Sequence, residues 1–272
     1  MIDPARRPRD FLELHHSEKP LLIPNPWDMG SAVLLQWLGF KALATTSSGF
    51  AATLGRLDGT VTREEAIAHS AAIVASTPLP VSADLENGFG DDPGEVAETV
   101  RMALAAGLAG CSIEDSTGRE EDPIYDAQLA VERVAAATEA AHAGPVPLVL
   151  TARAENLLHG RPDLADTIAR LQAFQEAGAD VLYAPGLRKL EQIRELVASV
   201  DRPVNVLALP GGPAVAQLAE AGVSRVSVGG GFAYAALGAA VEAARELQEQ
   251  GTYTFWERAR VGRESVRSAF AA

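Results

Sequence analysis

PVSADLENGFG at residues 80–90 and GCSIED at residues 110–115 are two apolar runs that each end in acidic side chains. If both runs are parallel strands, Asp84, Glu86 and Glu114 meet at one end of a sheet. Carboxylates that converge repel one another unless they share a proton or hold a cation. We therefore expect a hard cation with oxygen ligands, such as Mg2+, at this end of the sheet.

Six further apolar runs alternate with Ala- and Glu-rich stretches that have helical spacing. Glycines 107, 178 and 222 stand at the predicted helix ends, each just before the next apolar run. Eight strand–helix units predict an α/β fold, a (β/α)8 TIM barrel, with a doubly wound open sheet as the alternative. The predicted strands are 21–25, 42–46, 81–84, 110–114, 148–153, 181–184, 204–207 and 225–228.

No linker or low-complexity stretch divides the chain, so residues 1–272 are predicted to form a single domain. A helical extension is expected from about residue 251, and it carries Tyr253, Phe255, Trp256 and Phe270. Aromatic residues on a terminal helix usually cover either the barrel or a neighbouring subunit.

Composition excludes several classes of protein. The net charge of −13 argues against nucleic acid or an anionic membrane as a partner. No apolar stretch is long enough to span a membrane, and the N-terminus lacks the apolar core of a signal peptide. The single cysteine, Cys111, excludes an internal disulfide, fits the cytoplasm and is expected to be buried. None of the three lysines follows a predicted strand, which disfavours Schiff-base chemistry.

Active sites of this fold lie at the C-terminal ends of the strands. Asp84, the last residue of its strand, is the best direct metal ligand there, because Mg2+ keeps several waters and reaches other acids through them. Arg153 is the only arginine predicted at such an end. It either binds a substrate carboxylate or phosphate, or forms a salt bridge to Glu114 or Glu155 that organises the site.

Other groups near the strand ends carry weaker signals. The hydroxyl and N–H groups of residues 45–49 could hold a carboxylate, and Asn205 ends the seventh strand. Glycines 229–231 resemble a phosphate-binding loop, but close packing of helix on strand is the interpretation we favour. The general acid and base are open, with Tyr183, His159 and Glu121 as candidates.

At these residues the chain resembles the isocitrate lyase/phosphoenolpyruvate mutase superfamily over nearly its whole length. The resemblance rests on six motifs: Asn25-Pro26-Trp27-Asp28, Thr46-Ser47-Ser48-Gly49, Leu54-Gly55-x-x-Asp58, Asp84-x-Glu86-x-Gly88-Phe89-Gly90, Ile113-Glu114-Asp115 and Ala152-Arg153. It implies a barrel whose eighth helix is swapped between subunits, in homodimers or homotetramers.

The resemblance also implies a site. Mg2+ or Mn2+ would be held by Asp84, with Asp58, Glu86 and Glu114 in support. Substrates would be small 2-oxo or 2-hydroxy carboxylates. Arg153, Glu114 and Asp58 are then the catalytic candidates, and the substrate-binding candidates are Thr46, Ser47, Ser48, Arg153 and Asn205.

The chain departs from the superfamily in the groups that handle protons. The lyases carry a Lys-x-Cys-Gly-His loop after the fourth strand, whereas residues 116–123 here read STGREEDP. The Lys and Asn of the mutase and phosphonopyruvate hydrolase are missing as well. Where the mutase has a histidine and the lyases a glutamate after the sixth strand, this chain has Pro185-Gly186.

The first functional hypothesis is a Mg2+-dependent lyase that makes or breaks a C–C bond through a metal-stabilised enolate. Closure of residues 117–122 over the site would exclude water. The alternatives are an enzyme acting on a P–C bond, a 2-oxo acid decarboxylase, and a catalytically silent protein that binds a keto acid.

Overall fold

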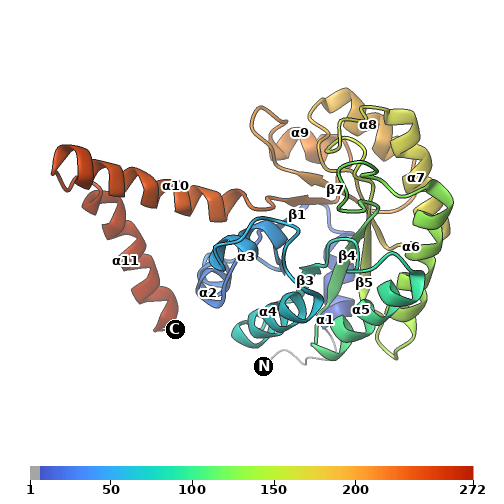
Figure 1. Cartoon of the computed structure of the whole chain (residues 1–272), viewed down its shortest axis with the longest axis horizontal. Coiled ribbons are helices and arrows are strands. Elements are labelled where there is room, and N and C mark those ends of the chain that lie inside the picture. Colours follow the sequence, from blue (N-terminus) through green and yellow to red (C-terminus); the bar gives the residue numbers. More distant parts are fainter. Residues whose placement is uncertain (1–6, 272) are drawn as a thin grey trace.

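The computed structural model describes residues 7–271, and these form an α/β barrel of eight parallel strands (Figure 1). The hydrogen-bonded order is β1-β8-β7-β6-β5-β4-β3-β2, and one further bond, from the Ala44 N–H to the Pro24 carbonyl at 3.1 Å, links β2 to the end of β1. This sequential order confirms the TIM-like barrel, since a doubly wound sheet reverses its strand order. The strands are Leu21–Ile23, Leu43–Ala44, Val81–Asp84, Gly110–Glu114, Val149–Arg153, Val181–Tyr183, Val204–Leu207 and Arg225–Ser227.

Each strand lies inside its predicted run, and two of the helices between the strands begin at residues that cap them. Thr62 caps α4 in a capping box with Glu65, and Asp92 caps α5 with Pro93 in the first turn. The helices are α1 Arg7–Leu14, α2 Met29–Trp37, α3 Ser47–Thr53, α4 Arg63–Ser76, α5 Pro93–Ala105, α6 Ala127–His142, α7 Leu164–Glu176, α8 Leu190–Ala198, α9 Val215–Glu220, α10 Gly231–Arg245, the π-helix η2 Glu246–Gln250 and α11 Trp256–Phe270.

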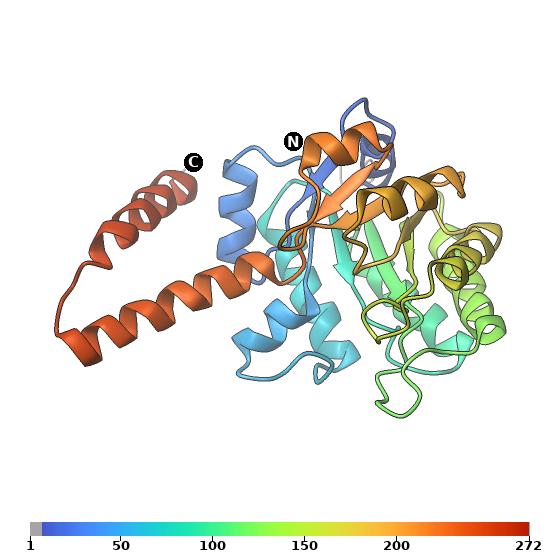
Figure 2. The same cartoon turned by 90° about the horizontal axis from the view of Figure 1, so that it is seen from above.

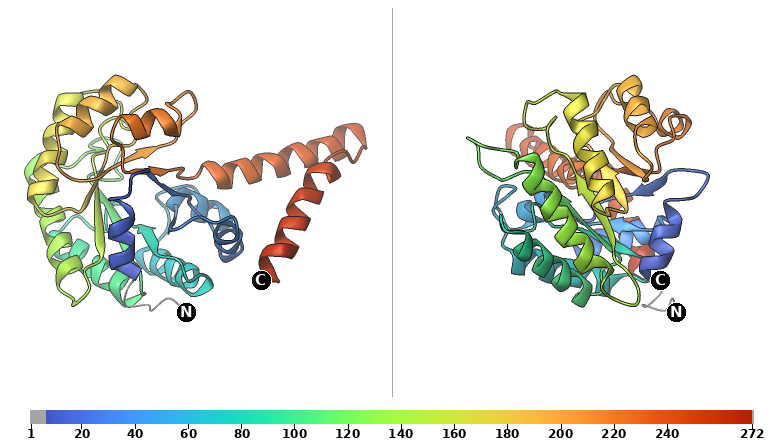
Figure 3. Two further views of the ribbon diagram at one scale, coloured as in Figure 1. Left: turned by 180° about the vertical axis from the view of Figure 1, so that it is seen from behind. Right: turned by 90° about the vertical axis from the view of Figure 1, so that its right-hand side faces the viewer.

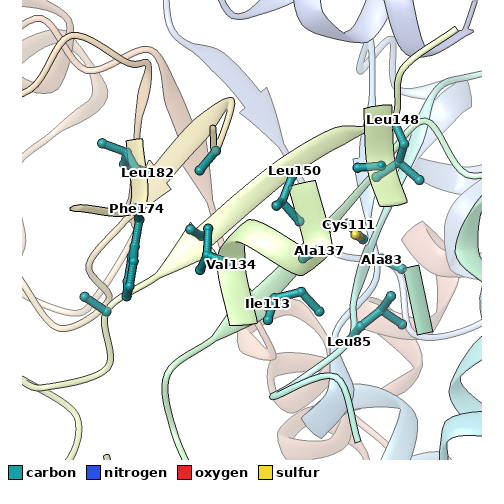
Figure 4. Packing of buried hydrophobic residues seen from close by; sticks show 14 of the residues in the cluster. Ala83, Leu85, Cys111, Ile113, Val134, Ala137, Leu148, Leu150, Phe174 and Leu182 are labelled. Atoms are coloured by element: carbon teal, nitrogen blue, oxygen red, sulfur yellow. The ribbon is translucent and has the colours of Figure 1, made fainter. Parts of the chain in front are cut away.

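The main hydrophobic core lies between the strands and the surrounding helices. Figure 4 shows Cys111, Ile113 and Leu150 of neighbouring strands among side chains of α6 such as Val134 and Ala137. Cys111 is fully buried, and burial raises the pKa of its thiol to about 12. The expectation of a packing role for this cysteine is therefore confirmed.

The inside of the barrel is polar rather than filled with branched apolar side chains. Side chains alternate along each strand, and the inward positions include Ser82, Ser112, Thr151, Asn205 and Ser227. Barrels of this class usually fill these layers with Val, Ile and Leu. Because the side chains here are small, a cavity remains open inside the barrel.

Helix α1 closes the N-terminal end of the barrel. Phe11 is fully buried there in a second hydrophobic cluster that includes Leu21, Val149 and Val181 from the beginnings of three strands. A side chain at Gly110 would come within 2.7 Å of the Phe11 ring, so glycine is required at that strand start. The polar interior therefore opens only at the opposite end, where the strands finish.

Helices α10 and α11 form a hairpin that projects from the barrel (Figures 1 and 2), and α11 returns to contact α2. The view from behind shows α10 leaving the barrel directly after β8 (Figure 3). The hairpin exposes Phe232, Tyr234, Leu237, Val241, Leu247, Tyr253, Trp256, Val261, Val266 and Phe270. Within residues 7–271, no helix is long and apolar enough to cross a membrane.

Candidate active site

Arg153, the last residue of β5, is the centre of the site because it pairs with three carboxylates. Its Nη1 lies 2.9 Å from Asp84 Oδ1, and its Nη2 lies 3.0 Å from Glu114 Oε2. Its Nε donates to Glu155 Oε1 at 2.8 Å. Burial alone would lower the pKa of Arg153, but the three carboxylates, Glu155 first, raise it well above its ordinary value. Salt bridges to both Glu114 and Glu155, the two partners proposed from the sequence, are thus present in the structure, together with the one to Asp84.

Asp84 is fixed by β2 and α3 as well as by Arg153. The Ser47 N–H and hydroxyl donate to its Oδ2 at 3.2 and 3.1 Å, and the Thr45 hydroxyl accepts from its backbone N–H at 2.9 Å. Thr46 caps α3 by accepting from the Gly49 N–H. Ser47, the first residue of α3 and 37 positions before Asp84 in the sequence, therefore helps to hold this carboxylate in place.

The loop after β3 has an unusual backbone. Glu86 and Phe89 adopt positive φ values of 48° and 62°, a conformation that L-residues rarely take. Arg133 of α6, almost fully buried, donates to the carbonyl oxygens of Gly90 at 2.6 Å and of Asn87. The Glu86 carbonyl accepts from the Glu114 N–H at 3.0 Å. These bonds keep the acidic loop against β4.

The crowded acids carry raised pKa values. Burial, then Asp84 and Asp58, raises the pKa of Glu86 to about 8. Burial also raises the pKa of Glu114 well above its usual value, and that of Asp58. Arg153 supplies one positive charge against these acids, so a further cation near them would favour their ionised forms.

The oxygen donors of these acids are of the type that Mg2+ and Mn2+ prefer. Among residues 7–271, no three Asp, Glu, His or Cys side chains are arranged to hold a metal ion between them. Mg2+ commonly uses only one or two carboxylates and keeps its remaining ligands as water. Asp84, with hydroxyls on one side and Glu86 two residues away, provides such an anchor.

One pocket of about 230 Å3 extends from the strand ends into the barrel. Seven of the predicted site residues line it, namely Thr46, Ser47, Ser48, Asp58, Asp84, Arg153 and Asn205. Glu86 and Glu114 do not line this pocket. Glu86 borders a small neighbouring pocket, and Glu114 forms a salt bridge with Arg153, which does line the main one.

The three candidate proton donors are placed very differently. Tyr183 of β6 lines the pocket with its ring centroid 5.3 Å from the Arg153 guanidinium carbon, and burial raises its pKa to about 12. His159 lies outside the pocket lining, with Nε2 3.2 Å from the Ser116 hydroxyl. Glu121 is exposed in the loop after β4. Only Tyr183 therefore faces the space where a substrate would bind.

The glycines after β8 pack against their neighbours. Asn25 Oδ1 accepts from the N–H groups of Val228 and Gly229 at 3.0 and 2.9 Å. A side chain at Gly230 would come within 2.6 Å of the Ser48 hydroxyl. These contacts agree with the packing interpretation of the glycine run.

Two contributors have larger roles than the sequence assigned to them, and a third, Arg225, was given no role from the sequence. Glu155, 2% exposed, is the most deeply buried partner of Arg153. Asp115 accepts from the Glu155 N–H at 2.8 Å and pairs with Arg170 at 3.2 Å, so it positions that segment. Arg225, at the beginning of β8, lies at the floor of the pocket. The only sequence signal for Arg225 was a charge inside a short apolar strand.

The fold and site define a class of α/β barrels that bind small carboxylates at the ends of their strands. The family model for phosphoenolpyruvate phosphomutase matches residues 11–248, and the chain belongs to this family, within the phosphoenolpyruvate mutase/isocitrate lyase superfamily of C–C lyases and P–C mutases.

Three similar proteins place the chain within this superfamily. A protein of Burkholderia cenocepacia J2315, an inferred lyase/mutase, has a crystal structure with a TM-score of 0.95 and 53% identity, covering 99% of this chain and 97% of that one. The 2-methylisocitrate lyase of Escherichia coli K12 is 32% identical over 195 residues, 69% of this chain and 64% of its own length. The oxaloacetate acetylhydrolase structure with its product oxalate has a TM-score of 0.83 and 25% identity, covering 92% of this chain and 89% of that one.

Proposed function

We propose that this protein is a Mg2+- or Mn2+-dependent lyase that makes or breaks a C–C bond in a small 2-hydroxy or 2-oxo carboxylate. The observation that carries the proposal is the convergence of Asp84, Arg153 and the hydroxyls of residues 46–48 on one pocket at the strand ends. The 2-methylisocitrate lyase and the oxalate complex among the similar proteins support both the reaction class and the substrate class.

Asp84 is the proposed direct metal ligand, with Asp58, Glu86 and Glu114 acting through water. When bound, the ion supplies Lewis-acid stabilisation of the negative charge that develops on the substrate oxygen. Arg153 has five N–H donors, of which three are engaged by its three carboxylates. The remaining two are proposed to orient a substrate carboxylate together with Ser47 and Ser48.

Proton transfer is assigned to Tyr183. Its hydroxyl remains protonated at neutral pH because burial raises its pKa to about 12, so it can donate a proton to a developing carbanion. The loop after β4 lacks the usual acid, and its Thr117 hydroxyl donates to the Asp122 carbonyl. That loop is proposed to close over the pocket and exclude water without supplying a proton.

Two chains are proposed to exchange α10 and α11, giving a homodimer or a dimer of dimers. The support is the row of apolar side chains that this hairpin exposes, including Leu237, Val241 and Trp256. A row of this kind on an extended hairpin is typical of a subunit interface. Residues 1–272 are then one barrel domain with a helical extension from about residue 251.

Turnover assays test the proposed function. The protein with Mg2+ is incubated with isocitrate, methylisocitrate, dimethylmalate, oxaloacetate or phosphonopyruvate, and 2-oxo acid and phosphate are measured. Formation of a 2-oxo acid from a hydroxy acid is the expected result. Phosphate release alone would reassign the protein to P–C chemistry. Stabilisation by oxalate and Mg2+ without turnover of any compound would identify a silent binding protein.

A matched variant tests the site itself. Asp84→Asn keeps the shape of the side chain but removes the charge, so Mg2+-dependent binding of oxalate should be lost while the fold remains. The control is Asp92→Asn, which changes an exposed helix cap on α5 away from the pocket. If Asp84→Asn binds oxalate with the same dependence on Mg2+ as the unchanged protein, the metal assignment is wrong.

A further inference from the structure

Arg225 is a buried cation with no carboxylate beside it. It is 5% exposed, and within residues 7–271 no Asp or Glu oxygen lies within 4.0 Å of its guanidinium group. Its Nε donates to Asn205 Oδ1 at 2.9 Å, and its Nη2 donates to the Thr151 hydroxyl at 3.1 Å. Its Nη1 lies 3.2 Å from His15 Nε2. All three partners are uncharged acceptors.

His15 cannot supply a negative charge, and its geometry fixes its role. Its Nδ1 lies 2.8 Å from the Phe11 carbonyl oxygen, so Nδ1 carries the hydrogen and Nε2 accepts from Arg225. The ring is 3% exposed, and burial together with Arg225 lowers its pKa to about 3. The neutral imidazole of His15, which follows α1 at the N-terminal end of the barrel, thus accepts a hydrogen bond from Arg225.

Two other buried arginines of the site are neutralised by carboxylates, whereas Arg133 donates to backbone carbonyl oxygens and lies over the Tyr125 ring. Arg153 has three carboxylates, and Arg170 pairs with Asp115 and Asp166. A buried charge is normally paired, because removing it from water is expensive unless an opposite charge compensates. Burial accordingly lowers the pKa of Arg225 to about 10, which still leaves it charged at neutral pH. Unlike Arg133, Arg225 borders an open pocket, so an anion that enters this pocket can supply the missing negative charge.

The pocket gives an anion a route to Arg225. The same 230 Å3 cavity that contains Asp84 and Arg153 at the strand ends is bordered by Arg225 at the opposite end. Between them the walls include Ser82, Ser112 and Ser227, whose small side chains leave space and offer hydroxyls. Arg225 has five N–H donors, of which three meet neutral acceptors, so two are left for a ligand.

We propose that Arg225 forms a second anion subsite at the floor of the pocket, which selects substrates that carry a second carboxylate. This inference rests on the proposed function: one carboxylate of the substrate lies near Arg153 and Ser48, and the other reaches into the barrel toward Arg225. The substrate class is then a compact dicarboxylate. Asn205 acts here as a positioning residue, because its amide oxygen holds Arg225 and its NH2 group donates to Ser227.

Malate and lactate test the subsite, because these 2-hydroxy acids differ in the second carboxylate. Calorimetry with Mg2+ should show malate binding roughly 10- to 100-fold more tightly than lactate, as expected for a charge-assisted hydrogen bond. Arg225→Met should remove this preference by weakening malate alone, and Arg225→Lys should retain part of it. A malate preference that survives in Arg225→Met would overturn the inference, and so would equal binding of both acids by the unchanged protein. Either result leaves the proposed function standing.

A second measurement does not depend on substrate binding or on the variants folding. Crystals of the unchanged protein are soaked in bromide, and anomalous scattering is used to locate the ion. A bromide ion within hydrogen-bond distance of the Arg225 guanidinium supports the subsite, and a floor without bromide overturns it. If the protein binds neither acid, the bromide result still decides the subsite, and the turnover assays decide the proposed function separately.

Discussion

Replacing Arg153 with methionine should destabilise the protein mainly through Glu155. The variant keeps an unbranched side chain of similar length but leaves three carboxylates without their shared cation. The side chains of Asp84 and Glu114 are 19% and 16% exposed, so water and protonation partly compensate them. The Glu155 side chain is only 3% exposed, so water cannot compensate its charge. Breaking a buried pair of this kind costs about 3–5 kcal/mol.

Urea unfolding of the unchanged protein and of three variants measures this cost. Arg153→Met should lose about 3–5 kcal/mol of unfolding free energy. The double variant Arg153→Met/Glu155→Gln should recover about half of that loss, because glutamine carries no charge to leave unpaired. The control Arg56→Met breaks an ion pair with Glu65 whose side chains are 45% and 34% exposed. It should change stability by about 1 kcal/mol or less.

Two results would refute this reasoning. One is an Arg153→Met variant that is no less stable than the Arg56→Met control. The other is a double variant that is no more stable than Arg153→Met, because the cost would then not arise from the unpaired Glu155 charge.

Three further predictions concern acid stability, assembly and the acidic loop. The folded pKa of His15 is about 3 against 6.5 in the unfolded chain, so only the unfolded state gains a proton between these values and stability falls as pH falls through this window. By pH 4 the loss from this group is about 3 kcal/mol, and His15→Gln should remove that part of the pH dependence in urea titrations; an unchanged slope would contradict the assignment. Leu237→Glu should shift the protein from dimer or tetramer to monomer in light scattering, and an unchanged mass would argue against the exchanged hairpin. Arg133→Met should lower Mg2+ affinity in calorimetry by releasing the loop after β3, an effect that would not be seen if this arginine only filled space.

The sequence by itself determined the fold, and the physical reason is local. Each strand is a short apolar run between turn and cap residues, such as Thr62 and Asp92, that act within a few positions of themselves. Parallel strands joined by helices in an unbroken series leave few topologies other than a barrel. Because strand ends carry the active site in this fold, the placement of Asp84 and Arg153 in one pocket followed from the same pattern.

Only the tertiary structure decided how these charges are paired and which remain unpaired. Asp84 meets Arg153 across 69 positions of the chain, and His15 meets Arg225 across 210, because the closing of the barrel and the docking of α1 set which side chains touch. Such pairings depend on long-range packing that leaves no periodic trace in a sequence. The position of Arg225 at the floor of the pocket could not be predicted for the same reason. A single arginine at the start of a strand faces a pocket only because the eight strands together form the barrel around it.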